Sequence, residues 1–207
     1  IAVNYEVDKK GKLIATVDLP ENIKGTFVWK GQNYPLVSGH QAFTINQQAS
    51  AGQRKYYVSS STGDDSNDGL TPKRAFKTLA KASQLRLFPG DSLLLRSGDI
   101  LLKESLFPVG SGRPENPIVI SSYGKGARPH IKPGHDAIYG IRIVNDAGYK
   151  IKGLEVSDCY GGIVVWEENT YNHEYIWIED CYFHDITDKD EPIGGGRNGR
   201  PVTTDLI

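Results

Sequence analysis

The sequence has 207 residues, of which 38% are hydrophobic, so it is long enough for one large domain or two small ones. Its 24 basic and 25 acidic residues are interspersed and give a net charge of −1, which argues against a nucleic-acid-binding surface. No run of about 18 apolar residues occurs, which argues against a membrane-spanning helix. The chain begins at Ile1 and contains no Met, so we expect a processed or trimmed piece whose lack of a leader says little about export.

The first segment, residues 1–48, is expected to form a small β-sandwich. Short apolar stretches alternate with turn signals such as Lys30-Gly31-Gln32, as in a domain of several short strands. Two aromatic residues, Trp29 and Tyr34, are either platforms for stacking sugars or members of a small core or interface, and the second interpretation is favoured. The expected strands are Tyr5–Val7, Leu13–Asp18, Thr26–Trp29, Asn33–Leu36 and Ala42–Ile45.

This first segment also resembles a known module. The stretch Leu19–Gly31, followed by Tyr34-Pro35-Leu36, is similar to the β-sandwich that closes bacterial α-L-rhamnosidase-type glycosidases. A change in composition near Gln47–Lys55 separates the module from the rest of the chain.

The second segment, residues 54–207, opens with a strand, a polar loop and a helix signal. The strand Tyr56–Ser59 leads into a loop rich in Ser, Asp and Gly, and Thr71-Pro72 is typical of a helix N-cap and first turn. On that helix Phe76, Leu79, Ala80 and Ser83 would share one face. An apolar stripe of this kind has to pack against other elements.

Alternating apolar pairs predict a series of strands after the helix. Cys159 recurs as Cys181, 22 positions later, within similar five-residue patterns, and this distance is about one coil of a solenoid. We therefore expect Cys159 to lie over or near Cys181 as a free, buried thiol, and Asp158 to lie near Asp180 as a structural corner residue. The alternating pairs are Leu93/Leu95, Ile118/Ile120, Ile141/Ile143, Leu154/Val156 and Ile176/Ile178.

The order of these signals resembles the right-handed parallel β-helices of the pectin-lyase-like superfamily. The resemblance rests on residues 56–82, Gly90–Asp99, Asn116–Gly124 and Ala127–Ile131, and it extends over 54–207. It implies an all-β chain: a small N-terminal β-sandwich, then a right-handed parallel β-helix whose first coil is capped by a helix. Residues 203–207 look like the start of another coil, so we expect the N-terminal coils of a longer β-helix.

One charged segment, His184–Pro201, concentrates the residue types that act on glycans. A His can act as a base near neutral pH, carboxylates can bind Ca²⁺, and Arg can hold a substrate carboxylate. The alternative is a solvated surface loop. We assign catalytic roles to His184, Asp185, Arg197 and Arg200, metal ligation to Asp188, Asp190 and Glu191, and substrate binding to Trp166, Glu167 and Lys189.

The resemblance implies a secreted, periplasmic or cell-surface bacterial protein that degrades polysaccharides. It would be a polysaccharide lyase or a glycoside hydrolase, acting on an acidic or plant-type glycan with Ca²⁺ as a candidate cofactor. The alternative is a non-catalytic carbohydrate-binding protein, such as an adhesin-like or tailspike-like solenoid. The expected partner is a polysaccharide or oligosaccharide, without nucleic acid.

Overall fold

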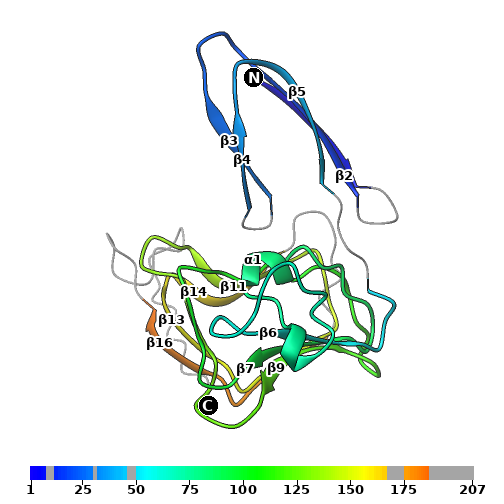
Figure 1. The fold of residues 1–207 in the computed structure, drawn as a ribbon, viewed down its shortest axis with the longest axis vertical. Helices are drawn as coiled ribbons and strands as arrows, with labels where there is room; N and C mark the ends of the chain where they lie inside the picture. Colours follow the sequence, from blue (N-terminus) through cyan, green and yellow to red (C-terminus); the bar gives the residue numbers. More distant parts are fainter. Residues whose placement is uncertain (8–11, 30–31, 46–49, 167–174, 187–207) are drawn as a thin grey trace, which may run out of the picture.

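The computed structural model describes residues 1–207 except 8–11, 30–31, 46–49, 167–174 and 187–207. Antiparallel sheets at the N-terminus are followed by a parallel β-solenoid with very little helix (Figure 1), which confirms the predicted all-β class. In the described part of the chain, no helix is long and apolar enough to span a membrane.

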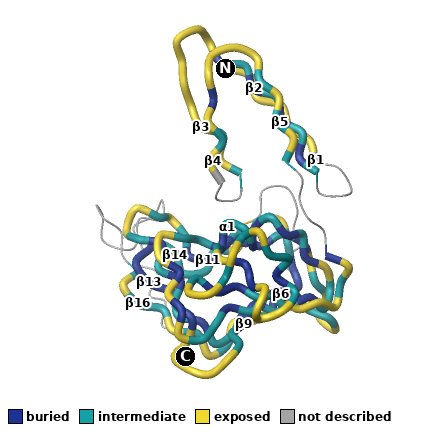
Figure 2. The backbone as a smooth tube through the Cα atoms, viewed as in Figure 1, coloured by how far each residue is buried: buried dark blue, intermediate teal, exposed yellow. Residues whose placement is uncertain are grey.

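The front module consists of two antiparallel sheets. Alternate side chains of its central strand are buried from Leu13 to Leu19, and the rings of Phe27 and Phe43 stack with centroids 5.8 Å apart. Much of the remaining surface of the module is exposed (Figure 2). The first sheet has the order β1-β2-β5, with β1 Ala2–Val7, β2 Leu13–Leu19 and β5 Gly39–Ile45, and the second pairs β3 Gly25–Trp29 with β4 Gln32–Leu36.

The solenoid stacks parallel strands into three sheets. The longest has the order β6-β7-β9-β12-β15, the next has the order β8-β10-β13-β16, and the third pairs β11 with β14. Their bounds are β6 Lys55–Val58, β7 Ser92–Arg96, β8 Ile100–Leu102, β9 Ile118–Tyr123, β10 His130–Lys132, β11 Tyr139–Val144, β12 Tyr149–Lys152, β13 Glu155–Cys159, β14 Gly161–Trp166, β15 Ile176–Glu179 and β16 Tyr182–Ile186.

Inward ladders of apolar side chains hold the coils together. In the longest sheet Leu93 pairs with Ile120, Ile120 with Ile151, and Ile151 with Ile178. The first three of these side chains are 0–1% exposed. Because strand side chains alternate between faces, the same strands direct their other residues outward, where a site can form.

The predicted helix is shorter than expected and begins later. A 3-10 turn spans Pro72–Arg74, and α1 covers only Leu79–Ala82. Thr71 makes no side-chain cap, whereas the Thr78 hydroxyl accepts a hydrogen bond from Lys81 N at 3.0 Å. Phe76 is not helical because its backbone bridges Val58, so the expected helical face was wrong, although its side chain is buried.

The predicted register of the coils was also wrong. Ile151 pairs with Ile178 and Cys159 with Ile186, so these coils are offset by 27 positions rather than 22. Asp158 is therefore level with Asp185 rather than Asp180. Cys181 follows β15, and its Sγ lies 3.9 Å from the carbonyl oxygen of Ile151.

The two thiols are free, as expected. Cys159 is fully buried and Cys181 is half-buried. Burial raises the pKa of the Cys159 thiol to about 11 and also raises the pKa of Cys181. Both therefore serve as small apolar fillers of the solenoid rather than as reactive groups.

Candidate functional site

Three of the predicted site residues lie in the described part of the chain. Trp166 ends β14 and is 48% exposed, while His184 and Asp185 project from β16. The remaining predicted residues lie outside the described residues: Glu167, Asp188, Lys189, Asp190, Glu191, Arg197 and Arg200.

His184 belongs to a cluster that the sequence did not reveal. We call His130, Glu155 and His184 the His–Glu–His cluster; they come from the neighbouring strands β10, β13 and β16. His184 Nε2 lies 3.0 Å from Glu155 Oε1, and His130 Nδ1 lies 3.4 Å from the same oxygen. The only sequence signal was the alternation in each strand, which places these residues opposite the buried Ile131 and Val156 and the partly buried Phe183.

Each imidazole has a second partner on its far side. His184 Nδ1 lies 2.9 Å from Asp185 Oδ2, and His130 Nε2 lies 2.8 Å from Ser157 Oγ. Hydrogen bonds to Glu155, then to Asp185, raise the pKa of His184. Burial lowers the pKa of His130, against the opposing effect of the Glu155 charge.

Asp158 has the structural role that the sequence analysis favoured. It lies near the end of β13 with φ of +55°, a region that Asp tolerates better than most residues. Its carboxylate lies 2.9 Å from Lys132 Nζ and 3.3 Å from His135 Nε2. The hydrogen bond from Lys132 holds the pKa of Asp158 below its usual value, although burial opposes the shift.

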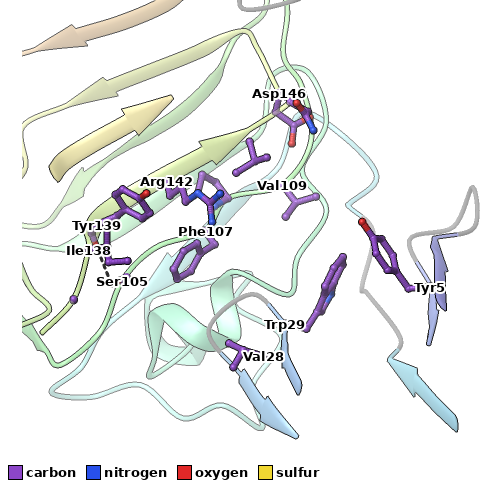
Figure 3. A pocket seen from close by; sticks show the side chains of 14 residues that line it. Tyr5, Val28, Trp29, Ser105, Phe107, Val109, Ile138, Tyr139, Arg142 and Asp146 are labelled. Atoms are coloured by element: carbon purple, nitrogen blue, oxygen red, sulfur yellow. Dashed lines mark hydrogen bonds between the residues drawn. The ribbon is translucent and has the colours of Figure 1, made fainter. Parts of the chain in front are cut away.

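A pocket of about 680 Å³ lies between the front module and the solenoid (Figure 3). Trp29 and Tyr5 face it from the module, with ring centroids 6.2 Å apart, whereas Tyr34 packs into the aromatic core around Phe27 and Phe43. The full lining is Tyr5, Val28, Trp29, Ser105, Phe107, Pro108, Val109, Ala137, Ile138, Tyr139, Arg142, Val144, Asn145 and Asp146.

Arg142 is the cation of this pocket. Its guanidinium carbon lies 5.2 Å from the centroid of the Tyr139 ring, in the range of a cation–π contact. Its Nε is buried, and no residue in the described part of the chain accepts a hydrogen bond from it. A buried donor without an acceptor costs free energy, so a ligand acceptor that the Arg142 side chain moves to meet would be favourable.

Asp146 is the carboxylate among the described lining residues, and it already has partners. Gly110 N donates to Oδ2 at 3.0 Å, and Ser111 Oγ donates to Oδ1 at 2.7 Å. Glycoside hydrolysis in most families uses two carboxyl groups on either side of the scissile bond. The described walls of the pocket are therefore equipped to bind a ligand rather than to cleave it.

Comparison with known proteins identifies relatives among glycosidases. No family model matches the chain. A stretch of 72 residues, 33% of this chain and 4% of the relative, is 40% identical to lacto-N-biosidase from Bifidobacterium longum subsp. longum. A stretch of 71 residues, 34% of this chain and 12% of the relative, is 32% identical to α-1,3-galactosidase A from Akkermansia muciniphila.

Two crystal structures of the GH136 lacto-N-biosidase from Eubacterium ramulus share the fold. The selenomethionine derivative has a TM-score of 0.52 and the native protein one of 0.50; both are 25% identical. The match covers 64% of this chain and 27% of the enzyme. The chain is thus a β-solenoid with distant similarity to carbohydrate-active enzymes, and it spans a small part of each one's length.

Proposed function

We propose that this chain belongs to a glycoside hydrolase and that the pocket between its front module and solenoid binds part of the glycan. The substrate class suggested by the relatives is a glycan with lacto-N-biose or α-1,3-linked galactose units. The sequence left a lyase and a hydrolase as alternatives. We favour the hydrolase because the similar proteins are named as glycosidases.

The observation that carries the proposal is the combination, in the pocket, of aromatic rings and an arginine whose Nε has no hydrogen-bond acceptor in the described part of the chain. Sugar rings have apolar faces, which stack on side chains such as Trp29 and Tyr139, and polar edges, which accept hydrogen bonds from groups such as the guanidinium of Arg142. The volume of about 680 Å³ lies within the roughly 300–1,000 Å³ of small-ligand sites.

A second candidate function is glycan binding without catalysis. It is favoured by the engagement of both oxygens of Asp146, which leaves the described lining without a free carboxylate. The two candidates differ in turnover: a hydrolase releases sugar, whereas a binding protein retains the intact glycan.

The roles assigned to the charged segment His184–Pro201 remain predictions. A Ca²⁺ site at Asp188, Asp190 and Glu191, catalytic roles for Arg197 and Arg200, and location outside the cytoplasm are proposals that follow from the sequence. If the Ca²⁺ site exists, chelator should lower the affinity for glycan and added Ca²⁺ should restore it.

The test uses the polypeptide that carries this chain and oligosaccharides ending in lacto-N-biose or α-1,3-linked galactose. Sugar release is measured by chromatography and affinity by calorimetry. Arg142→Met keeps the length of the side chain but removes the donor. Because a hydrogen bond to a charged group contributes about 1.5–3 kcal/mol, we expect affinity to fall about 10–100-fold.

The matched aromatic variants are Trp29→Leu in the pocket and Trp177→Leu on β15. Trp177 is 50% exposed and outside the pocket lining, so its loss should leave glycan affinity unchanged. Equal affinities for wild-type protein, Arg142→Met and Trp29→Leu would rule out the pocket. Binding without sugar release from any glycan in the panel would favour the second candidate.

A further inference from the structure

We propose that the His–Glu–His cluster binds a Zn²⁺ ion through His130 Nδ1, Glu155 Oε1 and His184 Nε2, with water as the fourth ligand. This inference is independent of the proposed glycosidase activity, because its evidence is the arrangement of donor atoms and its readout is metal binding. The cluster lies on the sheet that contains β10, β13 and β16, whereas the pocket is lined by β11.

The three donor atoms converge from adjacent strands. All lie within 4.8 Å of one another, and the two distances to Glu155 Oε1 are 3.0 and 3.4 Å. Tetrahedral Zn²⁺ with bonds of about 2.0–2.1 Å places its ligand atoms roughly 3.4 Å apart. Only the two imidazoles need to approach each other, and both rings are on strands whose register is fixed by the ladder.

Hydrogen bonds on the far side of each ring leave the near nitrogens available to a metal. Ser157 Oγ donates to Asp158 at 3.1 Å, so it is free to accept from His130 Nε2–H. That tautomer leaves a lone pair on Nδ1, which faces Glu155 Oε1. Two acceptors facing each other at 3.4 Å require a cation between them, either a proton or a metal.

His184 repeats this arrangement from the other side. Asp185 Oδ2 accepts from Nδ1–H, which orients Nε2 toward Glu155 Oε1. A ligating His commonly donates its other ring N–H to a carboxylate or another acceptor, which fixes the tautomer and makes the ring a better ligand. Both histidines of the cluster have such a partner.

The donor atoms of the cluster determine which metal ion it prefers. Imidazole nitrogen suits Zn²⁺ and other transition ions, whereas Ca²⁺ takes oxygen ligands almost exclusively. Two His and one Glu plus an open position match a known three-ligand arrangement for Zn²⁺. The side chains are 14%, 26% and 28% exposed for His130, Glu155 and His184, so solvent can supply the ion and the fourth ligand.

The test is a titration of chelator-treated protein with Co²⁺, followed by displacement with Zn²⁺. Co²⁺ bound by imidazole nitrogens in a tetrahedral site gives visible absorption bands, and competition with a chromogenic chelator gives the Zn²⁺ affinity. We expect one ion per chain. The variants are His130→Ala, His184→Ala and the nearly isosteric Glu155→Gln, which preserves packing if a truncation disturbs the fold.

Each of these variants should lose more affinity than Asp185→Asn, for which loss of an outer hydrogen-bond partner predicts a decrease of up to about 10–100-fold. His40→Ala is the control, because His40 also faces a carboxylate, Asp18, at 2.7 Å, but lies in the front module. Absence of the Co²⁺ bands, or equal Zn²⁺ affinity in wild-type protein and all three variants, would overturn the proposal and leave a proton as the shared cation.

Discussion

A Gly140→Ala variant would test whether β11 is packed tightly against its neighbours. The φ of Gly140 is outside the left-handed region, so an alanine suits the backbone, and the effect of Gly140→Ala is purely steric. The added Cβ would lie 2.3 Å from Val156 Cγ1 and 2.7 Å from the carbonyl oxygen of Gly162. Since overpacking usually costs about 1–3 kcal/mol and one contact is backbone, we expect a loss near 3 kcal/mol.

The second half of the experiment is a double-mutant cycle with Val156. Val156→Ala alone removes two buried methyl groups and should cost about 2 kcal/mol. In the double variant the new Cβ of residue 140 enters the vacated space, so the combined loss should be smaller than the sum by about 1 kcal/mol or more. The measurement is urea unfolding followed by circular dichroism and tryptophan fluorescence.

The control is Gly25→Ala, a strand glycine whose added Cβ would meet nothing closer than 3.6 Å. It should be neutral or stabilising, because alanine restricts the unfolded chain. Two results would refute the reasoning: a Gly140→Ala variant as stable as Gly25→Ala, or a double variant whose loss equals the sum within about 0.3–0.5 kcal/mol.

Three further predictions concern buried polar groups of the solenoid. Cys159, with a pKa raised to about 11, should react with a thiol reagent only after unfolding, and rapid stoichiometric labelling of native protein would contradict this. Burial opposes ionisation of Asp99, but hydrogen bonds from Ser61 and Ser59 hold its pKa below the usual value. The stability that the ionised Asp99 contributes is present above about pH 4 and is lost as the pH falls through the pKa of Asp99 in the folded protein. Asp99→Asn should therefore flatten the acid limb of a plot of urea midpoint against pH. Tyr149→Phe removes the hydrogen bond to the Gly110 carbonyl and should cost about 1–3 kcal/mol of unfolding free energy; no change in urea midpoint would argue against that bond.

The strands of the solenoid could be predicted because their inward positions are chemically uniform. Leu93, Ile120 and Ile151 occupy one buried ladder, so each strand shows the alternation that a half-buried sheet requires. The helix was overestimated because Phe76, which fits a helical stripe, is buried by a backbone bridge to Val58 instead. Apolar spacing alone does not distinguish these two ways of burial.

The coil length could not be predicted because an Asp with positive φ recurs at different corners of the coils. Asp158 and Asp180 both have positive φ, at +55° and +49°, but Asp158 lies near the end of β13 whereas Asp180 directly follows β15. The recurring Asp-Cys pattern therefore reflects a similar backbone conformation at the Asp rather than equivalent positions in the coils. The true partner of Asp158, Asp185, also has positive φ, at +51°, but is followed by Ile186.

The candidate sites depend on this register, which explains why only part of them was predicted. His184 stood out within a charged segment, whereas Glu155, 29 residues earlier, belongs to an otherwise ordinary strand. The sequence alone could not distinguish the roles of Trp29 and Tyr34, because both are large aromatic residues. Only the packing of the module directs Trp29 to the pocket and Tyr34 into the aromatic core.

The pocket and the His–Glu–His cluster are linked through the close approach of Gly140 to Val156. Tyr139, next to Gly140, lines the pocket, and Glu155, next to Val156, belongs to the cluster. Because adjacent strand residues face opposite sides, an overpacked core contact displaces both outward side chains. Gly140→Ala should therefore weaken glycan and Zn²⁺ binding together, whereas Arg142→Met should weaken only the first and Glu155→Gln only the second.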